Sequence, residues 1–260
     1  MVLFTAFISL PNAFCGATRG EAQVLIRCRK QKRKNEKNHH HRMSKFYDIH
    51  THRIHFQYDD NCTHILNINP FQLEETKTLR TFSFFSCGVH PWSIDDVDTQ
   101  MARLKEIASD TQIVAIGETG FDKNRGAEYT QQLAVFYRHI ELSEKLRKPL
   151  IIHCVRAWNE LLHVKRAVKH TQPWIIHSYR GKPELTQQLV NEGFLFSIGS
   201  QFNPLSLSLI PIHSLFCETD ESNLDIREIY SQAAITTNVE IEMFTKQLEQ
   251  NVWRVFPDVK

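Results

Sequence analysis

Short apolar runs and longer periodic segments alternate along the chain from Phe46 onward. The short runs are rich in β-branched and aromatic residues, as is typical of buried strands. Strands are predicted at 46–50, 62–68, 82–87, 112–117, 149–153, 173–177, 194–198 and 214–218. Helical periodicity is clearest at 97–109, 129–147, 157–170 and 183–191. In the segment 129–147, Leu133, Phe136 and Ile140 fall on one face and polar residues on the other, which predicts an amphipathic helix.

This order of elements predicts an α/β protein with a single TIM-type (β/α)8 barrel. The first repeat differs from the others, because the segment between His52 and Cys62 is too short for a crossover helix. We therefore expect an abbreviated first βα unit whose connection is a loop. An open sheet of seven strands is the alternative. The chain of 260 residues is long enough to bury the core of either arrangement.

The first 42 residues differ in composition from the rest. They hold nine Lys/Arg against two Glu, whereas the remaining residues hold 22 Lys/Arg against 27 Asp/Glu. A basic polar run such as 27–37 cannot build a core, so we predict a disordered basic extension over 1–42 and the barrel domain over 43–260. Met43 is then the expected working start of translation. A basic arm that binds nucleic acid is the alternative.

Targeting and redox features favour the cytoplasm. The apolar start of the chain lacks a basic n-region and is interrupted at Pro11, unlike a signal peptide. No apolar run approaches the roughly 20 residues needed to cross a bilayer. The six cysteines include no CxxC pair, and scattered thiols favour a reducing compartment. We therefore expect a cytoplasmic protein with no membrane attachment.

Residues that can bind a metal stand where five of the predicted strands end. Two histidines follow the first strand, and the other residues follow strands four, five, six and eight. The six residues are His50, His52, Glu118, His153, His177 and Asp220. In a (β/α)8 barrel, the carboxyl ends of the strands meet on the face that carries the active site. A histidine at one strand end is more often structural, but the whole set predicts a metal site.

The number of candidate ligands indicates two metal ions rather than one. Six ligands are too many for one tetrahedral zinc that keeps an open position, and they suit two adjacent divalent ions. Imidazole nitrogens and carboxylate oxygens suit magnesium, manganese or zinc. Glu118 is the expected bridge between the ions, and Asp220 is expected to orient or deprotonate the attacking water. These two carboxylates are the candidate catalytic residues.

Four neighbouring residues are candidates for supporting roles. His90, after the third strand, and Arg156, after the fifth, lie where an anionic substrate would bind. Asp48 is expected to accept a hydrogen bond from a ligand imidazole, and Asp122 to position the loop after the fourth strand. The histidines without such neighbours are predicted to lie at the surface or at helix ends: His55, His64, His139, His163 and His170.

Six short motifs occur in order along the chain. They are Asp48-Ile-His50-Thr-His52, Gly88-Val-His90-Pro91, Ala115-Ile-Gly117-Glu118-Thr-Gly120-Phe-Asp122, Ile151-Ile-His153-Cys, Ile175-Ile-His177-Ser and Glu218-Thr-Asp220. From about Met43 to Phe256, the sequence resembles the TatD-type metal-dependent deoxyribonucleases. The resemblance implies a TIM barrel, divalent-metal DNase activity and metal roles for the same six residues.

The chain departs from the family pattern at the rim of the expected pocket. The first crossover is shortened, Val155 is an extra residue before Arg156, and Glu221-Ser-Asn-Leu-Asp replaces a Pro-rich stretch. These changes leave the ligand set intact and bear on the choice of substrate.

The leading hypothesis is a phosphodiesterase that cleaves DNA from single-stranded ends with a water activated by two metal ions. The mildly acidic body disfavours extensive contact with duplex DNA, which usually requires a basic surface. A metal-dependent amidohydrolase or small-phosphoester hydrolase is the alternative, because the same ligands serve those reactions. A metal-stabilised binding protein without turnover is the second alternative. DNA is the expected partner, and the sequence indicates no obligate protein partner.

Overall fold

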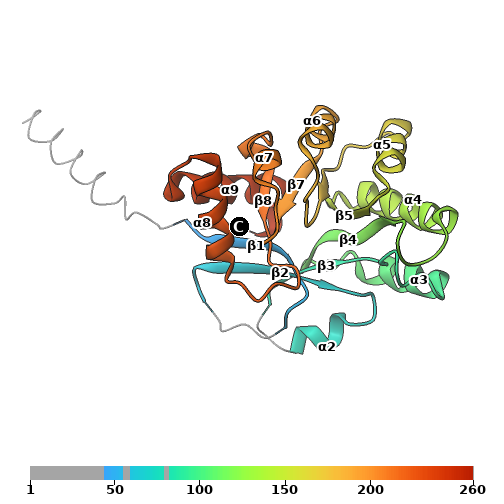
Figure 1. The fold of residues 1–260 in the computed structure, drawn as a ribbon. Helices are drawn as coiled ribbons and strands as arrows, with labels where there is room; N and C mark the ends of the chain where they lie inside the picture. The colour runs from blue at the N-terminus through green and yellow to red at the C-terminus, as the bar shows by residue number, and fades with distance from the viewer. Residues whose placement is uncertain (1–43, 55–58, 79–81, 260) are drawn as a thin grey trace, which may run out of the picture. The chain divides into compact units, whose positions relative to one another are not determined.

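The described part of the chain is built on eight parallel strands. The computed structural model describes residues 44–54, 59–78 and 82–259, so the predictions for residues 1–42, for Met43 and for His55 lie outside the described residues. The strands follow one another in chain order, each hydrogen-bonded to the next (Figure 1). They are β1 Phe46–Thr51, β2 Cys62–Ile68, β3 Phe84–Cys87, β4 Ile113–Asp122, β5 Leu150–Val155, β6 Trp174–Ile176, β7 Leu195–Ile198 and β8 Leu215–Cys217.

The sheet closes on itself just beyond the end of β8. Thr51 forms a parallel bridge with Asp220. The backbone N–H of Asp220 donates to the carbonyl of His50 at 3.0 Å, and the N–H of His52 donates to the carbonyl of Asp220 at 3.2 Å. The predicted (β/α)8 barrel is therefore confirmed, and the seven-stranded alternative is wrong. Three of the candidate ligands take part in the closure.

Helices lie outside the ring of strands (Figure 1). Those described are α2 Leu73–Thr78, α3 Val97–Ile107, α4 Tyr129–Leu146, α5 Trp158–Ala167, α6 Pro183–Asn191, α7 Pro204–Leu207, α8 Ile226–Thr237 and α9 Ile241–Val255, with 3-10 turns η1 Ile212–Ser214 and η2 Pro257–Val259. The four helices predicted most clearly correspond to α3, α4, α5 and α6. The largest difference is at α5, which ends at Ala167 because Val168 has an extended backbone.

β4 is longer than the sequence predicts. The predicted strand ends at Gly117, but β4 continues to Asp122, so Glu118 lies inside a strand rather than at its end. Gly117 and Gly120 have φ angles of 131° and 136°. A Cβ at these positions would lie 2.4 Å and 2.2 Å from carbonyl oxygens of β5. Because both residues lack a Cβ, the backbones of β4 and β5 approach closely and their pairing extends past Glu118.

The first connection agrees with the predicted loop as far as it is described. Residues 52–54 and 59–61, which lie between β1 and β2, contain no helix. α8 packs against β1 instead: the rings of Phe46 and Tyr230 meet edge to face at 5.1 Å. The Tyr230 hydroxyl also donates to the carbonyl of Tyr47 at 3.1 Å.

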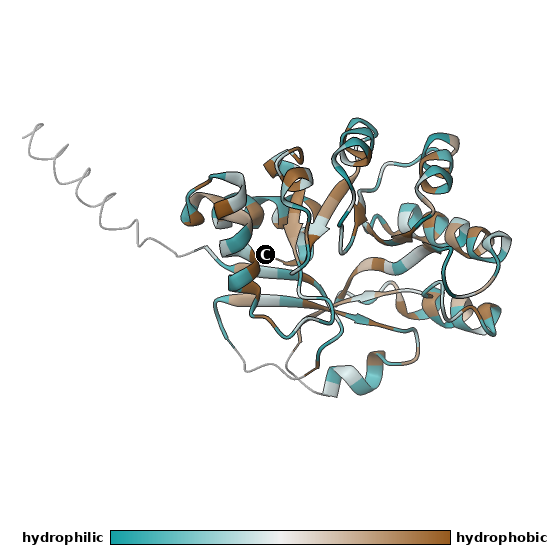
Figure 2. Cartoon of the chain, viewed as in Figure 1, coloured by the Kyte–Doolittle hydropathy of each residue, from teal (hydrophilic) through white to brown (hydrophobic). Residues whose placement is uncertain are grey.

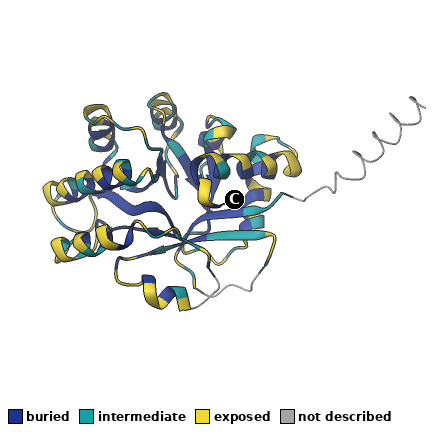
Figure 3. Cartoon of the chain, turned by 180° about the vertical axis from the view of Figure 1, so that it is seen from behind, coloured by how far each residue is buried: buried dark blue, intermediate teal, exposed yellow. Residues whose placement is uncertain are grey.

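The buried apolar residues form two clusters, one inside the barrel and one between the strands and the helices. Most strands are coloured as hydrophobic in Figure 2 and as buried in Figure 3. Ile49, Val114 and Phe216 belong to the inner cluster. Residues at the end of α9 and just after it pack in the same cluster, and the Trp253 indole donates to the Tyr47 hydroxyl at 3.0 Å. α9 therefore closes the amino end of the barrel and leaves the carboxyl end for chemistry.

Replacing Gly120 with alanine is expected to lower the free energy of unfolding by about 2 kcal/mol or more. The new Cβ would meet the carbonyl oxygen of His153 at 2.2 Å, in a backbone conformation that disfavours any side chain. Urea unfolding followed by circular dichroism measures the change.

Gly193→Ala is the matched control. Gly193 also has a positive φ, of 73°, but a Cβ there meets nothing within 4 Å. The free energy of unfolding of this variant should fall by about 1 kcal/mol, from backbone strain alone. Equal losses in the two variants would contradict a steric role for Gly120.

Candidate metal centre

The carboxylate of Glu118 lies at the centre of a group of histidines at the carboxyl end of the barrel. Its Oε1 lies 2.8 Å from Nδ1 of His153, 2.8 Å from Nε2 of His177 and 3.1 Å from Nε2 of His90. These histidines come from β5, from the residue after β6 and from the loop after β3. Histidines from three separate parts of the chain thus contact the same oxygen of Glu118.

The other oxygen of Glu118 faces His50 in β1 and His52, which directly follows that strand. Oε2 lies 3.4 Å from Nε2 of His50 and 3.3 Å from Nε2 of His52. Oδ1 of Asp220 lies 3.7 Å from Nε2 of His52. The structure therefore brings together all six residues that the sequence singled out as ligands, and it adds His90.

The donor atoms are close enough to share metal ions. Nε2 of His50 and Nε2 of His52 lie 3.2 Å apart, and Nδ1 of His153 lies 3.3 Å from Nε2 of His177. Four groups of three have ligand atoms within 4.8 Å of one another: His50–His52–Asp220, His50–Glu118–His177, His90–Glu118–His153 and His177–Glu218–Asp220. Neutral imidazoles and carboxylates that converge in this way fit divalent zinc, manganese or magnesium.

Glu118 is held ionised although it is only 3% exposed. Burial by itself raises the pKa of a carboxyl group, but the charge of His177 and hydrogen bonds from His153, His177 and His50 lower the pKa of Glu118 well below its usual value. For His177, burial lowers the pKa, yet Glu118 and Glu218 raise it well above the usual value. Positive charge thus compensates the buried carboxylate, and a metal cation can take the place of the protons.

Glu218 contacts the outer nitrogen of His177 and is a candidate site residue for which the sequence predicts no role. Its Oε1 lies 3.2 Å from Nδ1 of His177 and accepts a hydrogen bond from the backbone N–H of Ser178 at 2.7 Å. A carboxylate on the outer nitrogen of a ligand imidazole fixes the tautomer and orientation of the ring. The sequence signal for this residue is its position two residues before Asp220 in the Glu218-Thr-Asp220 motif.

Asp48 has partners other than the one expected of it. Its carboxylate accepts hydrogen bonds from the backbone N–H and the hydroxyl of Thr219, at 2.9 Å and 2.6 Å, and lies 3.1 Å from Nδ1 of His64. Nδ1 of His50 is buried without a hydrogen-bond partner among the described residues. Asp48 therefore positions the segment that carries Glu218 and Asp220, rather than a ligand imidazole.

Asp122 contacts a candidate ligand and the loop that follows it. Its Oδ2 accepts a hydrogen bond from the Trp92 indole at 2.7 Å and lies 3.2 Å from Nε2 of His153. Its Oδ1 accepts from the N–H of Asn124 at 2.8 Å. Asp122 thus contacts the His153 ring and also holds the backbone of the loop after β4.

The two predicted substrate contacts lie at different depths. His90 is partly buried and touches Glu118, so it lies in the candidate metal-binding cluster rather than at the rim alone. Burial lowers the pKa of His90 and outweighs the opposing effect of Glu118, which favours the neutral ring. Arg156 is exposed after β5, and the described residues offer its guanidinium no hydrogen-bond or ion-pair partner. It is free to meet an anion in solution.

His139 on α4 is completely buried, contrary to the prediction of a surface or helix-end position. Its Nε2 accepts a hydrogen bond from the backbone N–H of Val89 at 3.0 Å, and its Nδ1 lies 2.8 Å from the carbonyl of Val135. The neutral ring satisfies both contacts, and burial lowers its pKa to about 4. His139 thus anchors the residue next to His90.

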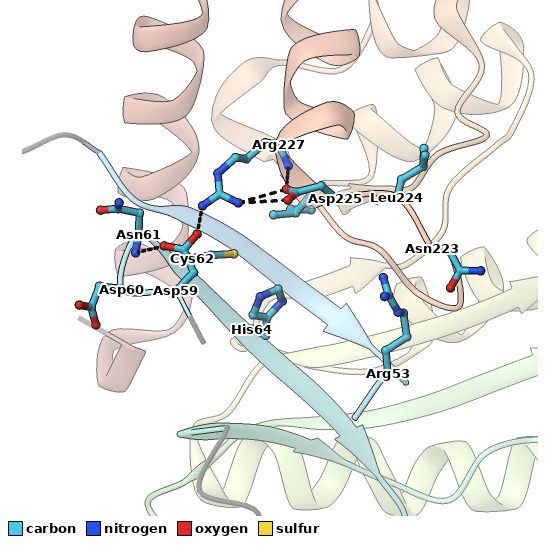
Figure 4. Close-up of a pocket in the computed structure, with 11 residues that line it drawn as sticks. Arg53, Asp59, Asp60, Asn61, Cys62, His64, Asn223, Leu224, Asp225 and Arg227 are labelled. Atoms are coloured by element: carbon cyan, nitrogen blue, oxygen red, sulfur yellow. Dashed lines mark hydrogen bonds and ion pairs between the residues drawn. The ribbon is translucent and has the colours of Figure 1, made fainter. Parts of the chain in front are cut away.

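A separate cavity of about 590 Å³ lies beside β2 and the start of α8 (Figure 4). Arg227 lines this cavity and forms ion pairs with Asp59 and Asp225. Its lining consists of Arg53, Asp59, Asp60, Asn61, Cys62, His64, Asn223, Leu224, Asp225, Ile226 and Arg227. None of the six predicted ligands lines this cavity, so it is distinct from the metal centre.

We predict that metal binding releases protons and weakens as the pH falls from 8 to 6. His177 holds its proton above the usual pKa in the absence of metal, because Glu118 and Glu218 outweigh the effect of burial. A cation must displace that proton, so the apparent affinity for Zn²⁺ or Mn²⁺ should drop by up to about tenfold per pH unit. Calorimetric titration in two buffers with different ionisation enthalpies counts the protons. Binding without proton release would contradict this coupling.

Acidification is expected to destabilise the fold through His139. Because burial lowers the pKa of His139 to about 4 from its usual 6.5, its contribution to the free energy of unfolding is complete above pH 6.5 and is lost as the pH falls toward 4. The free energy of unfolding should fall by about 2 kcal/mol between pH 7.5 and pH 5. Urea unfolding in EDTA at the two pH values measures it.

His139→Gln should show a smaller loss over the same range, since the variant lacks the titrating group. His163→Gln, at an exposed histidine on α5, is the control and should behave as the wild type. The same pH dependence in all three proteins would refute the role of His139.

None of the helices within the described ranges combines the length and the hydropathy that a membrane span requires. The four cysteines of this part, Cys62, Cys87, Cys154 and Cys217, are free thiols.

The chain is similar in sequence to proteins described as metal-dependent hydrolases. The family model described as TatD related DNase matches residues 36–257. An uncharacterized metal-dependent hydrolase of Buchnera aphidicola is 28% identical over 194 residues, which cover 66% of this chain and 73% of that protein. A protein of Erwinia billingiae described as 3'-5' ssDNA/RNA exonuclease TatD is 29% identical over 181 residues, covering 64% of this chain and 69% of that protein.

A solved structure shares the architecture. YJJV, a TatD homolog from Escherichia coli, superposes with a TM-score of 0.71 at 16% identity, covering 83% of this chain and 99% of that one. A TatD family hydrolase from Entamoeba histolytica gives a TM-score of 0.66 at 15% identity, covering 82% and 98%. Since the family model spans most of the sequence, the chain belongs to the TatD related DNase family of metal-dependent hydrolases.

Proposed function

We propose that this protein is a two-metal phosphodiesterase that cleaves DNA from single-stranded ends. The observation that carries the proposal is the division of the Glu118 carboxylate between two groups of imidazoles. Oε2 faces His50 and His52, and Oε1 faces His153 and His177. A carboxylate with a separate set of ligands on each oxygen is suited to bridge two ions.

The residues present fit two divalent ions of magnesium, manganese or zinc. His50, His52 and Asp220 would hold one, and His153 and His177 the other, with Glu118 between them. Two such ions supply Lewis-acid activation of water and charge for both the attacking and the leaving oxygen at phosphorus. Glu118 keeps the two ligand groups together, because it is ionised and buried at their centre.

Asp220 is the proposed acceptor of the proton from the attacking water. Its backbone is fixed on both sides by hydrogen bonds to His50 and His52, while its side chain is only partly buried. The residue before it, Thr219, is held by two hydrogen bonds to the carboxylate of Asp48. A carboxylate with a rigid backbone and an accessible oxygen meets the geometric requirement for a general base.

Nucleic acid is the substrate class that the surroundings favour. The relative from Erwinia billingiae and a relative from a Pantoea species are both described as 3'-5' ssDNA/RNA exonuclease TatD. The residues after 42 have a net negative charge, which disfavours a long duplex footprint. Arg156 offers local positive charge beside the cluster for one or a few phosphates. The free thiols fit the reducing cytoplasm, which we propose as the location.

The full-length protein with Mg²⁺, Mn²⁺ or Zn²⁺ is expected to release nucleotides from single-stranded DNA, and EDTA should abolish the reaction. Glu118→Gln should lower kcat by about 100-fold or more, because it removes the charge that bridges the ligand groups. Gel analysis of an end-labelled oligonucleotide gives the rates. Glu141→Gln, at an exposed glutamate of α4, is the matched control and should retain full activity.

Other outcomes would identify a different function. Intact DNA together with metal-dependent cleavage of an amide, a lactone or a small phosphoester would make the protein an amidohydrolase or small-phosphoester hydrolase. Stoichiometric metal bound with full coordination and no turnover of any substrate would make it a metal-stabilised binding protein.

A further inference from the structure

Trp92 is an exposed aromatic side chain fixed beside the metal centre. It is 40% exposed, yet its indole N–H donates to the buried carboxylate of Asp122 at 2.7 Å. Its ring meets that of His90 at 4.6 Å and that of His153 at 5.5 Å, both edge to face. Since His90 and His153 both touch Glu118, Trp92 is one side chain away from the centre of the cluster.

A positive charge lies against the same ring. The guanidinium carbon of Arg125 is 4.0 Å from the centroid of Trp92. Arg125 is exposed, and no carboxylate among the described residues pairs with it. Gly126 fixes the arrangement, since a Cβ there would lie 2.2 Å from the carbonyl oxygen of Pro91. The loops after β3 and β4 are therefore in close contact and hold Trp92 and Arg125 together.

Core packing does not account for this tryptophan. Trp174, by contrast, is 1% exposed and packs against Phe136 and Phe194. The ring contacts, the hydrogen bond and the cation–π contact of Trp92 are made with two histidine rings, a carboxylate and a guanidinium. A flat aromatic surface with an adjacent guanidinium is the arrangement on which proteins stack the bases of single-stranded nucleic acid.

We propose that Trp92 and Arg125 form a nucleobase subsite of the metal centre. The base of the nucleotide next to the scissile phosphate stacks on this pair, and the guanidinium also faces the negative backbone. The inference rests on the proposed function and adds to it the feature that holds the substrate. It accounts for a preference for single strands, because a base in a duplex is already stacked on its neighbours. It predicts little discrimination among bases, since every base has a flat π face.

The test compares two single-stranded oligonucleotides that differ only in their ends. One carries ordinary nucleotides throughout, and in the other the last two residues at each end are abasic. The wild type should show a KM roughly tenfold lower for the first. Trp92→Leu should remove this difference by raising the KM for the base-bearing strand, and Trp92→Phe should keep most of it, because the ring remains. Arg125→Gln should remove part of it.

The ratio of the KM values for the two oligonucleotides separates the effect of stacking from structural effects. Loss of the hydrogen bond to Asp122 occurs in both Trp92 variants and affects both oligonucleotides alike. Tyr137→Leu removes an aromatic side chain of α4 that is also 40% exposed, and it should leave the ratio unchanged. A Trp92→Leu protein that keeps the full preference for bases would overturn the subsite.

Failure of the proposed function gives a different result. If the wild type cleaves neither oligonucleotide with any of the metals, the phosphodiesterase proposal fails. Binding of the two labelled oligonucleotides in EDTA, followed by fluorescence anisotropy, then decides the subsite independently. Binding of the base-bearing strand that is roughly tenfold tighter, and that Trp92→Leu abolishes, supports it. Equal binding of both strands overturns it.

Discussion

The ionised carboxylate of Glu118 is held almost completely buried at the mouth of a hydrophobic barrel. Such a charge is costly to bury unless positive charge and hydrogen-bond donors surround it. Five imidazoles from β1, the β3 loop, β5 and the end of β6 meet that requirement. Each of these elements must therefore reach one point, so the position of Glu118 constrains the arrangement of half the barrel.

The same hydrogen bonds close the barrel and build the site. β1 and β8 are joined through the backbones of His50, His52 and Asp220, and the carboxylate of Asp48 ties β1 to Thr219. On the other side, the glycines of β4 allow its backbone to approach β5, which carries His153. Opening the sheet at either place would separate ligands. Stability and metal binding are thus coupled through shared contacts, as expected where bound metal stabilises the folded state.

Features that depend on local residue patterns could be predicted from the sequence. Features that depend on contacts between residues far apart in the chain could not. Strand and helix positions, and the ligands at strand ends, depend on local patterns that a sequence displays directly. The length of β4 was missed, because glycines usually indicate a strand end and only the neighbouring strand shows that they permit closer pairing. The burial of His139 and the role of Glu218 were also missed. Each depends on a partner far away in sequence, Val89 in one case and His177 in the other.

The sequence by itself determined the class of fold and the composition of the candidate ligand set, since alternating patterns specify βα units and such units bring their strand ends to one face. Only the tertiary structure decided which atoms meet. It placed the two oxygens of Glu118 against different imidazoles and joined Asp48 to Thr219 by a hydrogen bond. It also set the Trp92 ring beside the candidate metal centre and against the guanidinium of Arg125. These contacts depend on strand register, loop paths and side-chain directions, which local residue patterns do not encode.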